Sequence, residues 1–290
     1  MDVSFLVVGI ARDCQKTIGK TISAITGLLP PSSPTDFFIV ESDSKDGTVE
    51  EITRLQIANP NLGFASLGAL SSKIPDRILR IAECRNAYMS YIDEQLGSGK
   101  HYDYVVVADL DGVNLKVRSR RPLSELLSLS RVICSSQRGR YYDILALRKE
   151  GWVDKDWRLA ITYEVSQGID RLTSYLKNVS RKQIRLKWTM SNITVESAFG
   201  GLAVYPLEAI AGLRYSAEKL TSDIYQCEHV ALNLEVRNRG YVVEIAPSLK
   251  NSGSLAHSLL AYQPLRFLAF TFGSLRQILN TLWIRIGKHR

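Results

Sequence analysis

Apolar and polar positions along the first 110 residues switch between a strand-like and a helix-like period. Continuous apolar, β-branched runs are typical of strands buried on both faces of a sheet. They predict strands at Val3–Ile10, Asp36–Val40, Leu62–Leu67 and Tyr104–Ala108. Apolar residues spaced three and four apart predict helices at Cys14–Leu29, from the N-cap Asp46 onward, and at Asp76–Leu96. Strands that alternate with helices form a parallel sheet with right-handed crossovers.

The pattern after residue 112 is less regular. It predicts helices at Leu123–Ser130, within Ile161–Leu176 and at Gln226–Gly240, and strands at Val132–Ser135, Ile144–Leu147, Gly201–Tyr205 and Tyr241–Ile245. The expected fold is therefore α/β, with a central, mostly parallel sheet flanked by helices.

Polar clusters follow three of the predicted strands, at Ala11-Arg12-Asp13, Glu41-Ser-Asp43 and Asp109-Leu-Asp111. Ligands of parallel sheets collect at the carboxyl ends of the strands. Two acids spaced i, i+2 just beyond a strand end can reach one hard cation, and Mg²⁺ or Mn²⁺ takes one or two carboxylates plus phosphate oxygens. The alternative is that Asp109 caps a turn and Asp111-Gly112 is a turn dipeptide.

Two further clusters suggest contacts to a nucleotide and its phosphates. Glu41 and Asp43 can accept from a base or ribose, or they form a polar loop that feeds the next helix. The arginines of the long helix, Arg77, Arg80 and Arg85, suit bidentate phosphate recognition or a solvated helix face. Asn86 has poor propensity for a helix interior, which favours a specific role for it.

Composition and charge exclude several classes of protein. The chain is 45% hydrophobic and 23% charged, as in globular proteins. The four cysteines are scattered and match no zinc spacing, and no apolar run spans a bilayer or makes a signal peptide, so we expect a protein of the reducing cytosol. Five of the eight excess positive charges fall in residues 261–290, which disfavours a nucleic-acid-binding face.

The same C-terminal segment carries an apolar stripe at alternating three- and four-residue spacing, from Leu265 to Ile286. Basic residues and Trp283 beside such a stripe suit a helix that lies on an anionic membrane surface. Docking on the protein's own core, or pairing with a second copy, predicts the same stripe.

These motifs together resemble GT-A glycosyltransferases. Val40-Glu-Ser-Asp-Ser-Lys-Asp-Gly-Thr48 looks like the strand-to-helix signature of the family-two group, and Arg77-Ile…Ala82-Glu-Cys-Arg-Asn86 is similar to capsule-associated mannosyltransferases. Tyr141-Tyr-Asp-Ile-Leu-Ala-Leu-Arg148 adds to the second likeness, and the resemblance covers roughly residues 3–250. It implies a nucleotide-binding half at 1–112, an acceptor-binding and catalytic half of the same domain at 113–258, and the amphipathic helix at 259–290.

The resemblance also implies roles for individual residues. The residues implied on the donor side are Ala11, Arg12, Glu41, Asp43, Arg85 and Asn86, and the metal pair is Asp109 and Asp111. The Gly200-Gly201 pair either edges the sugar pocket or only eases the packing of a strand. Cys227-Glu-His-Val-Ala-Leu232 stands where the family has Glu-Asp-x-x-Leu, so Glu228 or His229 is the expected base, with Asp223 as a further candidate. If the anomeric configuration is retained, no base is needed and Glu228 positions the sugar. His257 is a candidate third metal ligand, or a structural histidine.

Trp152, Asp154, Asp156 and Trp157 combine aromatic and acidic side chains, as sugar sites do. We expect Asp143, Trp152, Asp156 and Trp157 to contact the acceptor, although an aromatic lid packed on the sheet predicts the same residues.

The expected function is transfer of a sugar, such as mannose, from a nucleotide-sugar donor to a glycan or lipid-linked acceptor with Mn²⁺ or Mg²⁺. A sugar nucleotidyltransferase is the enzymatic alternative, but the Ala11-Arg-Asp-Cys14 turn is not the Gly-rich phosphate loop it needs. A non-catalytic scaffold that kept the fold is the second alternative.

Overall fold

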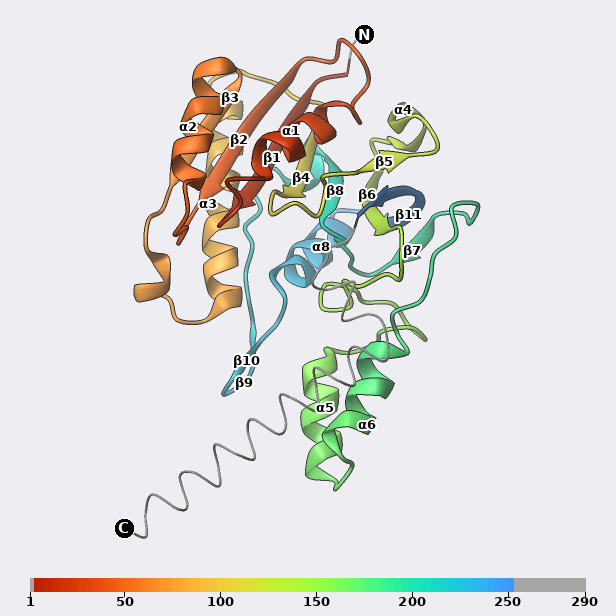
Figure 1. Cartoon of the computed structure of the whole chain (residues 1–290). Helices are drawn as coiled ribbons and strands as arrows, with labels where there is room; N and C mark the ends of the chain where they lie inside the picture. Colours follow the sequence, from red (N-terminus) through yellow and green to blue (C-terminus); the bar gives the residue numbers. More distant parts are fainter. Residues whose placement is uncertain (1–2, 253–290) are drawn as a thin grey trace, which may run out of the picture.

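The computed structural model describes residues 3–252, so the predicted helix at 259–290 and His257 lie outside the described residues. In the first half, strands and helices alternate as the sequence predicts (Figure 1). They are β1 (Phe5–Ala11), α1 (Ile18–Thr26), β2 (Thr35–Glu41), α2 (Thr48–Ala58), β3 (Leu62–Ser66), the 3-10 turn η1 (Leu70–Ser72), α3 (Arg77–Gly97) and β4 (Tyr104–Asp109).

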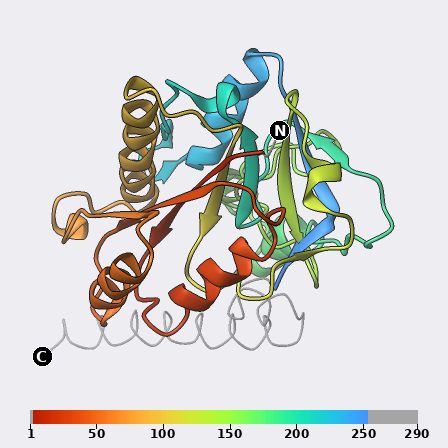
Figure 2. The ribbon, with the colours of Figure 1, turned by 90° about the horizontal axis from the view of Figure 1, so that it is seen from above.

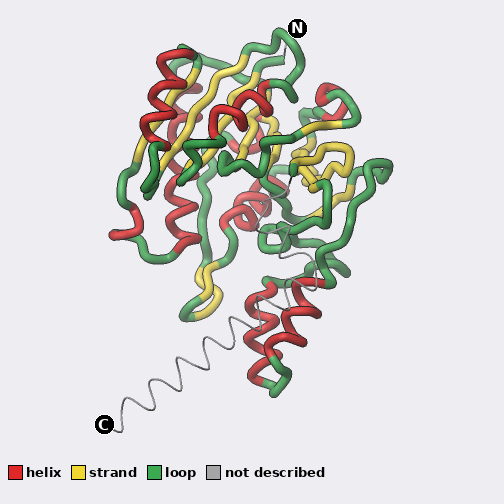
Figure 3. The backbone as a smooth tube through the Cα atoms, in the orientation of Figure 1, coloured by secondary structure: helices red, strands yellow, loops and turns green. Residues whose placement is uncertain are grey.

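The second half has shorter elements and more connecting loops (Figure 3). They are β5 (Arg118–Ser119), α4 (Leu123–Leu126), β6 (Arg131–Gln137), α5 (Trp157–Ser166), α6 (Arg171–Tyr175), the π turn η2 (Leu176–Ser180), β7 (Ile193–Val195), β8 (Leu202–Pro206), α7 (Leu207–Ile210), β9 (Lys219–Thr221), β10 (Ile224–Tyr225), α8 (Glu228–Asn238) and β11 (Val242–Asn251). Helices α5 and α6 pack together and extend away from the sheet (Figure 1).

The predicted fold class is confirmed by a single large sheet in the order β3-β2-β1-β4-β8-β6-β11-β5, with β7 also on β11. Strands β1 to β4 are parallel, and so are β6 and β11, whereas β8, β5 and β7 run antiparallel to their neighbours. Ile10 pairs with Asp109 and Ala11 with Glu41. The carboxyl ends of β1, β2 and β4 are therefore level, which brings their polar clusters to one edge.

Helices cover both faces of the sheet (Figure 2). Phe5 and Val7 of β1 face a buried cluster with the apolar stripes of α1 and α2, and Leu6 and Val8 face a second cluster with α3 and α8. Because alternate residues of a strand point to opposite faces, both sets are apolar and the strand reads as a continuous hydrophobic run.

Helix α3 begins at the sheet edge that carries the polar clusters. The Asp76 side chain caps it by accepting from the Ile78 and Leu79 amides at 2.8 and 3.1 Å. A helix N-terminus offers unpaired amides and a positive dipole end, so the edge favours anions.

Two predicted elements of the second half differ from the structure. The helix predicted at Leu123–Ser130 ends at Leu126, since the Ser128 hydroxyl accepts from the Ser130 amide and stabilises a turn instead. The strand predicted at Ile144–Leu147 does not form. Its backbone instead turns, with the Ile144 amide bonded to the Tyr142 carbonyl.

Strand β11 is longer than the predicted Tyr241–Ile245 segment and continues through Pro247. Its pairing with β6 shifts register between Ala246 and Lys250, so Pro247, which has no amide hydrogen, lies in the irregular stretch. Among residues 3–252, no helix combines the length and the apolar character that crossing a bilayer requires.

Gly200, just before β8, has little space for a side chain. It has φ of +72°, and a Cβ there would lie 2.2 Å from the Ser135 carbonyl oxygen. Gly212 has the same φ of +72°, but a Cβ there would meet no atom within 4 Å. We expect Gly200→Ala to lower the free energy of unfolding by about 1–3 kcal/mol more than Gly212→Ala, because overpacking adds to the shared backbone strain. Urea unfolding measures both, and equal losses would contradict the packing argument.

Candidate active site

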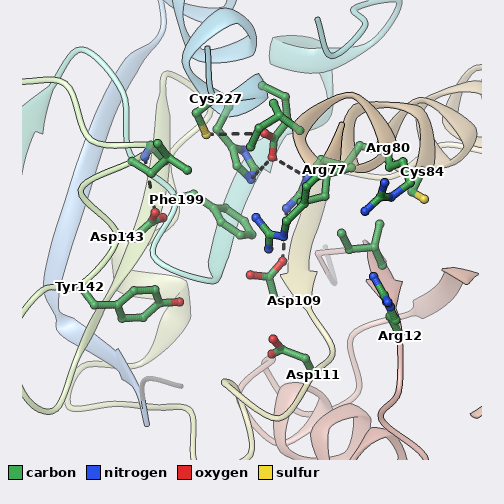
Figure 4. A pocket seen from close by; sticks show the side chains of 18 of the residues that line it. Arg12, Arg77, Arg80, Cys84, Asp109, Asp111, Tyr142, Asp143, Phe199 and Cys227 are labelled. Atoms are coloured by element: carbon green, nitrogen blue, oxygen red, sulfur yellow. Dashed lines mark hydrogen bonds and ion pairs between the residues drawn. The ribbon is translucent and has the colours of Figure 1, made fainter. Parts of the chain in front are cut away.

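A cleft of about 650 Å³ opens at the carboxyl ends of β1 and β4 (Figure 4). Its charged lining combines two groups of side chains. The basic group is Arg12, Arg77, Arg80 and Arg85, and the acidic group is Asp43, Asp109, Asp111, Asp143 and Glu228. The cleft therefore gathers most of the predicted site residues, including Ala11, Trp157 and His229.

The centre of the cleft is an ion-pair relay around Arg85, which is only 3% exposed. Its Nη2 donates to Asp109 Oδ1 and its Nε donates to Glu228 Oε1, both at 3.2 Å. Its Nη1 donates to the Tyr88 hydroxyl at 3.2 Å. The Phe199 ring lies 5.0 Å from its Cζ, so the guanidinium is also held by a cation–π contact. Arg85 thus joins α3 to the ends of β4 and the start of α8.

The ionised form of Asp109 is stabilised less well than its ion pair with Arg85 suggests. Burial first, and then the neighbouring carboxylates of Asp111 and Asp143, raise its pKa to about 7 despite the opposing effect of Arg85. Asp109 therefore binds a proton more readily than an ordinary aspartate does. A cation bound beside Asp109 would favour the ionised form and displace that proton.

Asp111 points into the same space as Asp109 from the turn after β4 (Figure 4). Its Oδ1 accepts from the Val113 amide at 3.2 Å, which leaves its second oxygen facing the cleft. Among residues 3–252, no group of three His, Cys, Asp or Glu side chains is arranged to hold a metal ion. Two carboxylates with an excess of negative charge around them fit Mg²⁺ or Mn²⁺, which completes its shell with phosphate oxygens and water.

The wall beside β1 and β2 is basic, and its loops are strained. Asp13 and Asp43 have φ of +46° and +59°, in the left-handed region that favours glycine. Asp43 accepts from the Ser71 amide at 2.8 Å and lies 3.8 Å from Arg80 Nε. Burial opposes ionisation of Asp43, but the Ser71 hydrogen bonds and the nearby arginines outweigh it and lower its pKa. Strained residues at strand ends are often part of a binding site.

Two residues predicted on the donor side lie behind the cleft wall. Glu41 accepts from the Ser44 amide at 2.9 Å and the Ser66 hydroxyl at 2.5 Å, so both carboxylate oxygens hold the loop after β2. Asn86 bonds the Tyr215 backbone twice, with its Nδ2 donating to the carbonyl at 2.9 Å and its Oδ1 accepting from the amide at 2.8 Å. These contacts account for a polar residue in mid-helix, because Asn86 fastens α3 to the loop before β9.

Gly200 and Gly201 also lie behind the cleft, where Gly200 positions Asp143. The Gly200 amide donates to Asp143 Oδ2 at 2.8 Å, and its carbonyl accepts from Asn251 Nδ2 at 2.7 Å. Burial raises the pKa of Asp143 even though the Gly200 amide lowers it. Asp143 therefore faces the cleft as a carboxylate that is more basic than usual.

Glu228 and His229 are neighbours at the start of α8, and their environments differ. Glu228 is tied to Arg85, whereas His229 stacks on Phe199 with ring centroids 3.9 Å apart. Burial, and then the charge of Arg85, lower the pKa of His229 well below 6.5. Neither ring nitrogen has a hydrogen-bond partner among the described residues. His229 is therefore a neutral imidazole with unused polar atoms at the cleft wall.

Three of the remaining predicted residues lie away from the cleft. Asp156 is buried, caps α5 by accepting from the Arg158 amide at 2.9 Å, and pairs with Arg158 and Arg148 at 2.7 and 3.5 Å. Trp152 lines a separate surface pocket and donates to the Lys182 carbonyl at 2.7 Å. Asp223 is exposed in the turn between β9 and β10 and accepts from the Ser222 hydroxyl.

Sequence reasoning missed several residues of the cleft wall, namely Tyr142, Gln183 and Phe199. Phe199 precedes the Gly pair and Tyr142 precedes Asp143, so both neighbour predicted residues. Gln183 comes from a loop with no periodic pattern, and the sequence carries no signal for it.

Several solved structures resemble this chain in the arrangement of the backbone. The chain is similar to the mannosyltransferase PcManGT from Pyrobaculum calidifontis, solved with GDP-Man and Mn²⁺, at a TM-score of 0.48 and 12% identity over 88% of this chain and 58% of that chain. It is similar to S. aureus TarS at a TM-score of 0.44 and 12% identity, over 91% of this chain and 64% of that chain. It is also similar to glucosyl-3-phosphoglycerate synthase from Mycobacterium tuberculosis, solved with Mn²⁺, UDP and phosphoglyceric acid. The TM-score is 0.43 and the identity 15%, over 87% of this chain and 71% of that chain.

The chain thus spans about three fifths of the first two proteins' length. Neither a protein-family model nor a curated protein sequence matches the chain.

The Arg85 relay generates a stability prediction. Arg85→Met leaves the Glu228 carboxylate buried without a counter-charge, so we expect the free energy of unfolding to fall by about 3–5 kcal/mol. Adding Glu228→Gln should restore part of that loss, because the orphaned charge is removed. Urea unfolding of the two single variants and the double variant measures the coupling.

Arg54→Met is the matched control, since it breaks an exposed arginine–glutamate pair with Glu51 and should leave the unfolding midpoint unchanged. Purely additive losses at Arg85 and Glu228 would show that the relay carries no coupling energy.

Proposed function

We propose that the chain is a glycosyltransferase that uses Mn²⁺ or Mg²⁺ to transfer a sugar from a nucleotide-sugar donor to a glycan or lipid-linked acceptor. The observation that carries the proposal is the placement of Asp109 and Asp111 at the end of β4, facing Arg12, Arg77 and Arg80 across one cleft. An acidic pair beside a basic wall is suited to a diphosphate bridged by a cation, because the acids hold the cation and the arginines hold phosphate oxygens.

In this proposal Asp109 and Asp111 are the protein ligands of the cation. The cation supplies electrostatic stabilisation of the charge that develops on the leaving diphosphate. Arg85 holds Asp109 in place from behind, at 3.2 Å, and so fixes one ligand before the donor arrives. Arg12, Arg77 and Arg80 line the opposite side of the cleft, where they contact the diphosphate.

The acceptor side of the proposal lies around Asp143 and Glu228. The half-buried carboxylate of Asp143 has a raised pKa, faces the cleft and suits an acceptor hydroxyl. Glu228 is the proposed base of an inverting reaction, or the group that positions the sugar in a retaining one. The depressed pKa of His229 makes it a weak proton acceptor, so we assign it to the cleft wall beside the sugar, where its ring stacks on Phe199.

The two halves, 1–112 for the nucleotide and 113–258 for the acceptor, form part of the same proposal. Mannose as the donor sugar, surface-polysaccharide synthesis as the pathway and the cytosolic face of a membrane as the location are its finer parts. The basic segment at 259–290 is proposed to contact that membrane or a second copy of the chain.

Substitution of the acid pair tests the proposal. We expect Asp109→Asn and Asp111→Asn each to lower Mn²⁺-dependent release of nucleoside diphosphate from the nucleotide sugar by roughly 100-fold or more, since cation stabilisation of the leaving group contributes several kcal/mol. The donor is first chosen by a thermal-shift screen of nucleotide sugars with and without Mn²⁺.

Asp223→Asn is the matched control, because it removes one exposed carboxylate outside the cleft and should leave turnover near wild type. Near-normal turnover in both cleft variants would refute the site. Release of pyrophosphate from a nucleoside triphosphate and a sugar phosphate would instead support a nucleotidyltransferase, and tight nucleotide binding without turnover would support a scaffold.

A further inference from the structure

A second charged feature lies at the sheet edge opposite β3. Five cations and one aromatic side chain gather there from β5, the segment after it, the end of β6, the loop before β7 and β11. We call this the edge patch, and it consists of Arg118, Arg120, Arg138, Arg185, Lys250 and Trp188. Strands β5 and β11 pair with each other (Figure 1), and this pairing places Arg118 opposite Lys250 at the centre of the patch.

Trp188 organises the centre of the edge patch. Lys250 Nζ lies 4.9 Å from the indole centroid, and the Cζ atoms of Arg120 and Arg118 lie 5.0 and 5.4 Å from it. Cation–π contacts attract each cation to the ring and so offset the repulsion between like charges. Three positive charges are thereby held in a fixed arrangement before any ligand is present.

The positive charge of the edge patch is not neutralised within the described residues. Lys250 is 1% exposed and its ammonium donates to the Leu186 carbonyl, a neutral partner. None of the salt bridges among residues 3–252 includes one of the five cations, whereas the nearby Arg121 and Arg131 pair with Glu125 and Glu244. Residues 253–290 contain no Asp or Glu that could supply the missing charge.

Two further observations point to an anionic ligand. Arg138 Nε is buried without a hydrogen-bond partner among the described residues, although Nη2 of the same guanidinium donates to the Lys116 carbonyl at 3.0 Å. Burial, reinforced by the neighbouring Arg118, lowers the pKa of Arg138. Burial, reinforced by Arg185 and Arg120, lowers the pKa of Lys250. Like charges thus oppose one another at a site that an anion would relieve.

The edge patch continues from the acceptor wall of the cleft. Gln183 lines the cleft, and its carbonyl accepts from Arg140 Nη1 at 3.3 Å. Arg140 also forms a β-bridge with Arg185 of the edge patch. An elongated acceptor whose reacting end lay beside Asp143 would therefore extend over these cations.

We propose that the edge patch binds phosphate or carboxylate groups carried along the acceptor glycan, so that the preferred acceptor is an anionic polysaccharide. This inference rests on the proposed function, because it assigns the patch to the acceptor of that reaction. Arginines suit it because a guanidinium contacts such groups in a bidentate way. The patch lies at the β5 edge of the sheet, whereas the strands β1, β2 and β3 of the nucleotide half lie toward the other edge, so the patch selects the acceptor without contacting the donor.

Binding of labelled dextran that carries phosphate monoesters tests the proposal, with neutral dextran of equal length as the reference probe. The Arg118→Gln/Arg120→Gln double variant removes two exposed cations and keeps Trp188 and Lys250, so it should fold with an unchanged melting temperature. We expect the full chain to bind phosphodextran at low salt, and the double variant to bind it about tenfold more weakly with a shallower salt dependence. Fluorescence anisotropy of the labelled probes measures this.

Arg121→Gln is the matched control, because Arg121 is exposed beside the edge patch but paired with Glu125 at 3.1 Å, and it should bind like wild type. Equal binding of phosphodextran and neutral dextran, or equal losses in the control and the double variant, would overturn the proposal. Capture by phosphatidylglycerol vesicles that is lost in the double variant would assign the patch to lipid headgroups instead. Tighter binding of single-stranded DNA than of phosphodextran at equal phosphate would assign it to nucleic acid.

These outcomes are independent of turnover. Asp109→Asn leaves the edge patch intact, so phosphodextran binding should persist in a variant with no transfer activity. If the proposed function fails and the patch still binds, the two ideas are separated. If nucleotide binding and Mn²⁺ dependence hold while phosphodextran does not bind, the acceptor assignment alone is wrong.

Discussion

The buried guanidinium of Arg85 is the constraint on which the arrangement of the cleft depends. A charge that is 3% exposed is costly unless it is paired and hydrogen-bonded, and this one reaches acids on two other elements, Asp109 of β4 and Glu228 of α8. Because the three residues lie on elements of both halves of the chain, satisfying one side chain fixes how α3, β4 and α8 meet. The cleft is formed at that junction.

The same relay leaves the cleft with unbalanced charge. Arg85 is shared between two carboxylates while Asp111 and Asp143 add two more, and burial raises the pKa of Asp109 to about 7. Across the cleft, Arg12, which follows β1, and Arg77 and Arg80 of α3 give an excess of positive charge. A cation on one side and a phosphate-bearing ligand on the other would balance both, which is why the charge distribution favours a metal-bridged diphosphate over either ligand alone.

The sequence predicts the first half of the fold well because its signals are local. The buried strand runs, the Asp76 cap and the acids after β4 are each readable within a few residues. The pairing of Arg85 with Glu228 joins residues 143 apart, and no local pattern encodes it. The sequence marks Asn86 as unusual in a helix and predicts an acceptor contact for Asp156, but the polar atoms of Asn86 hold a loop and those of Asp156 cap α5. The apolar run at Ile144–Leu147 looks like a strand and instead forms a cleft wall, since tertiary packing outweighs β-propensity.

The central claim is that one divalent cation binds between Asp109 and Asp111 together with a nucleoside diphosphate. Crystals of the full chain grown with Mn²⁺ and the stabilising nucleotide, with data collected at the manganese absorption edge, test it most directly. The account predicts an anomalous peak within about 2.0–2.3 Å of an oxygen of each carboxylate and in contact with the diphosphate. Nucleotide bound in the cleft with no peak there, or a peak held by other side chains, would contradict it.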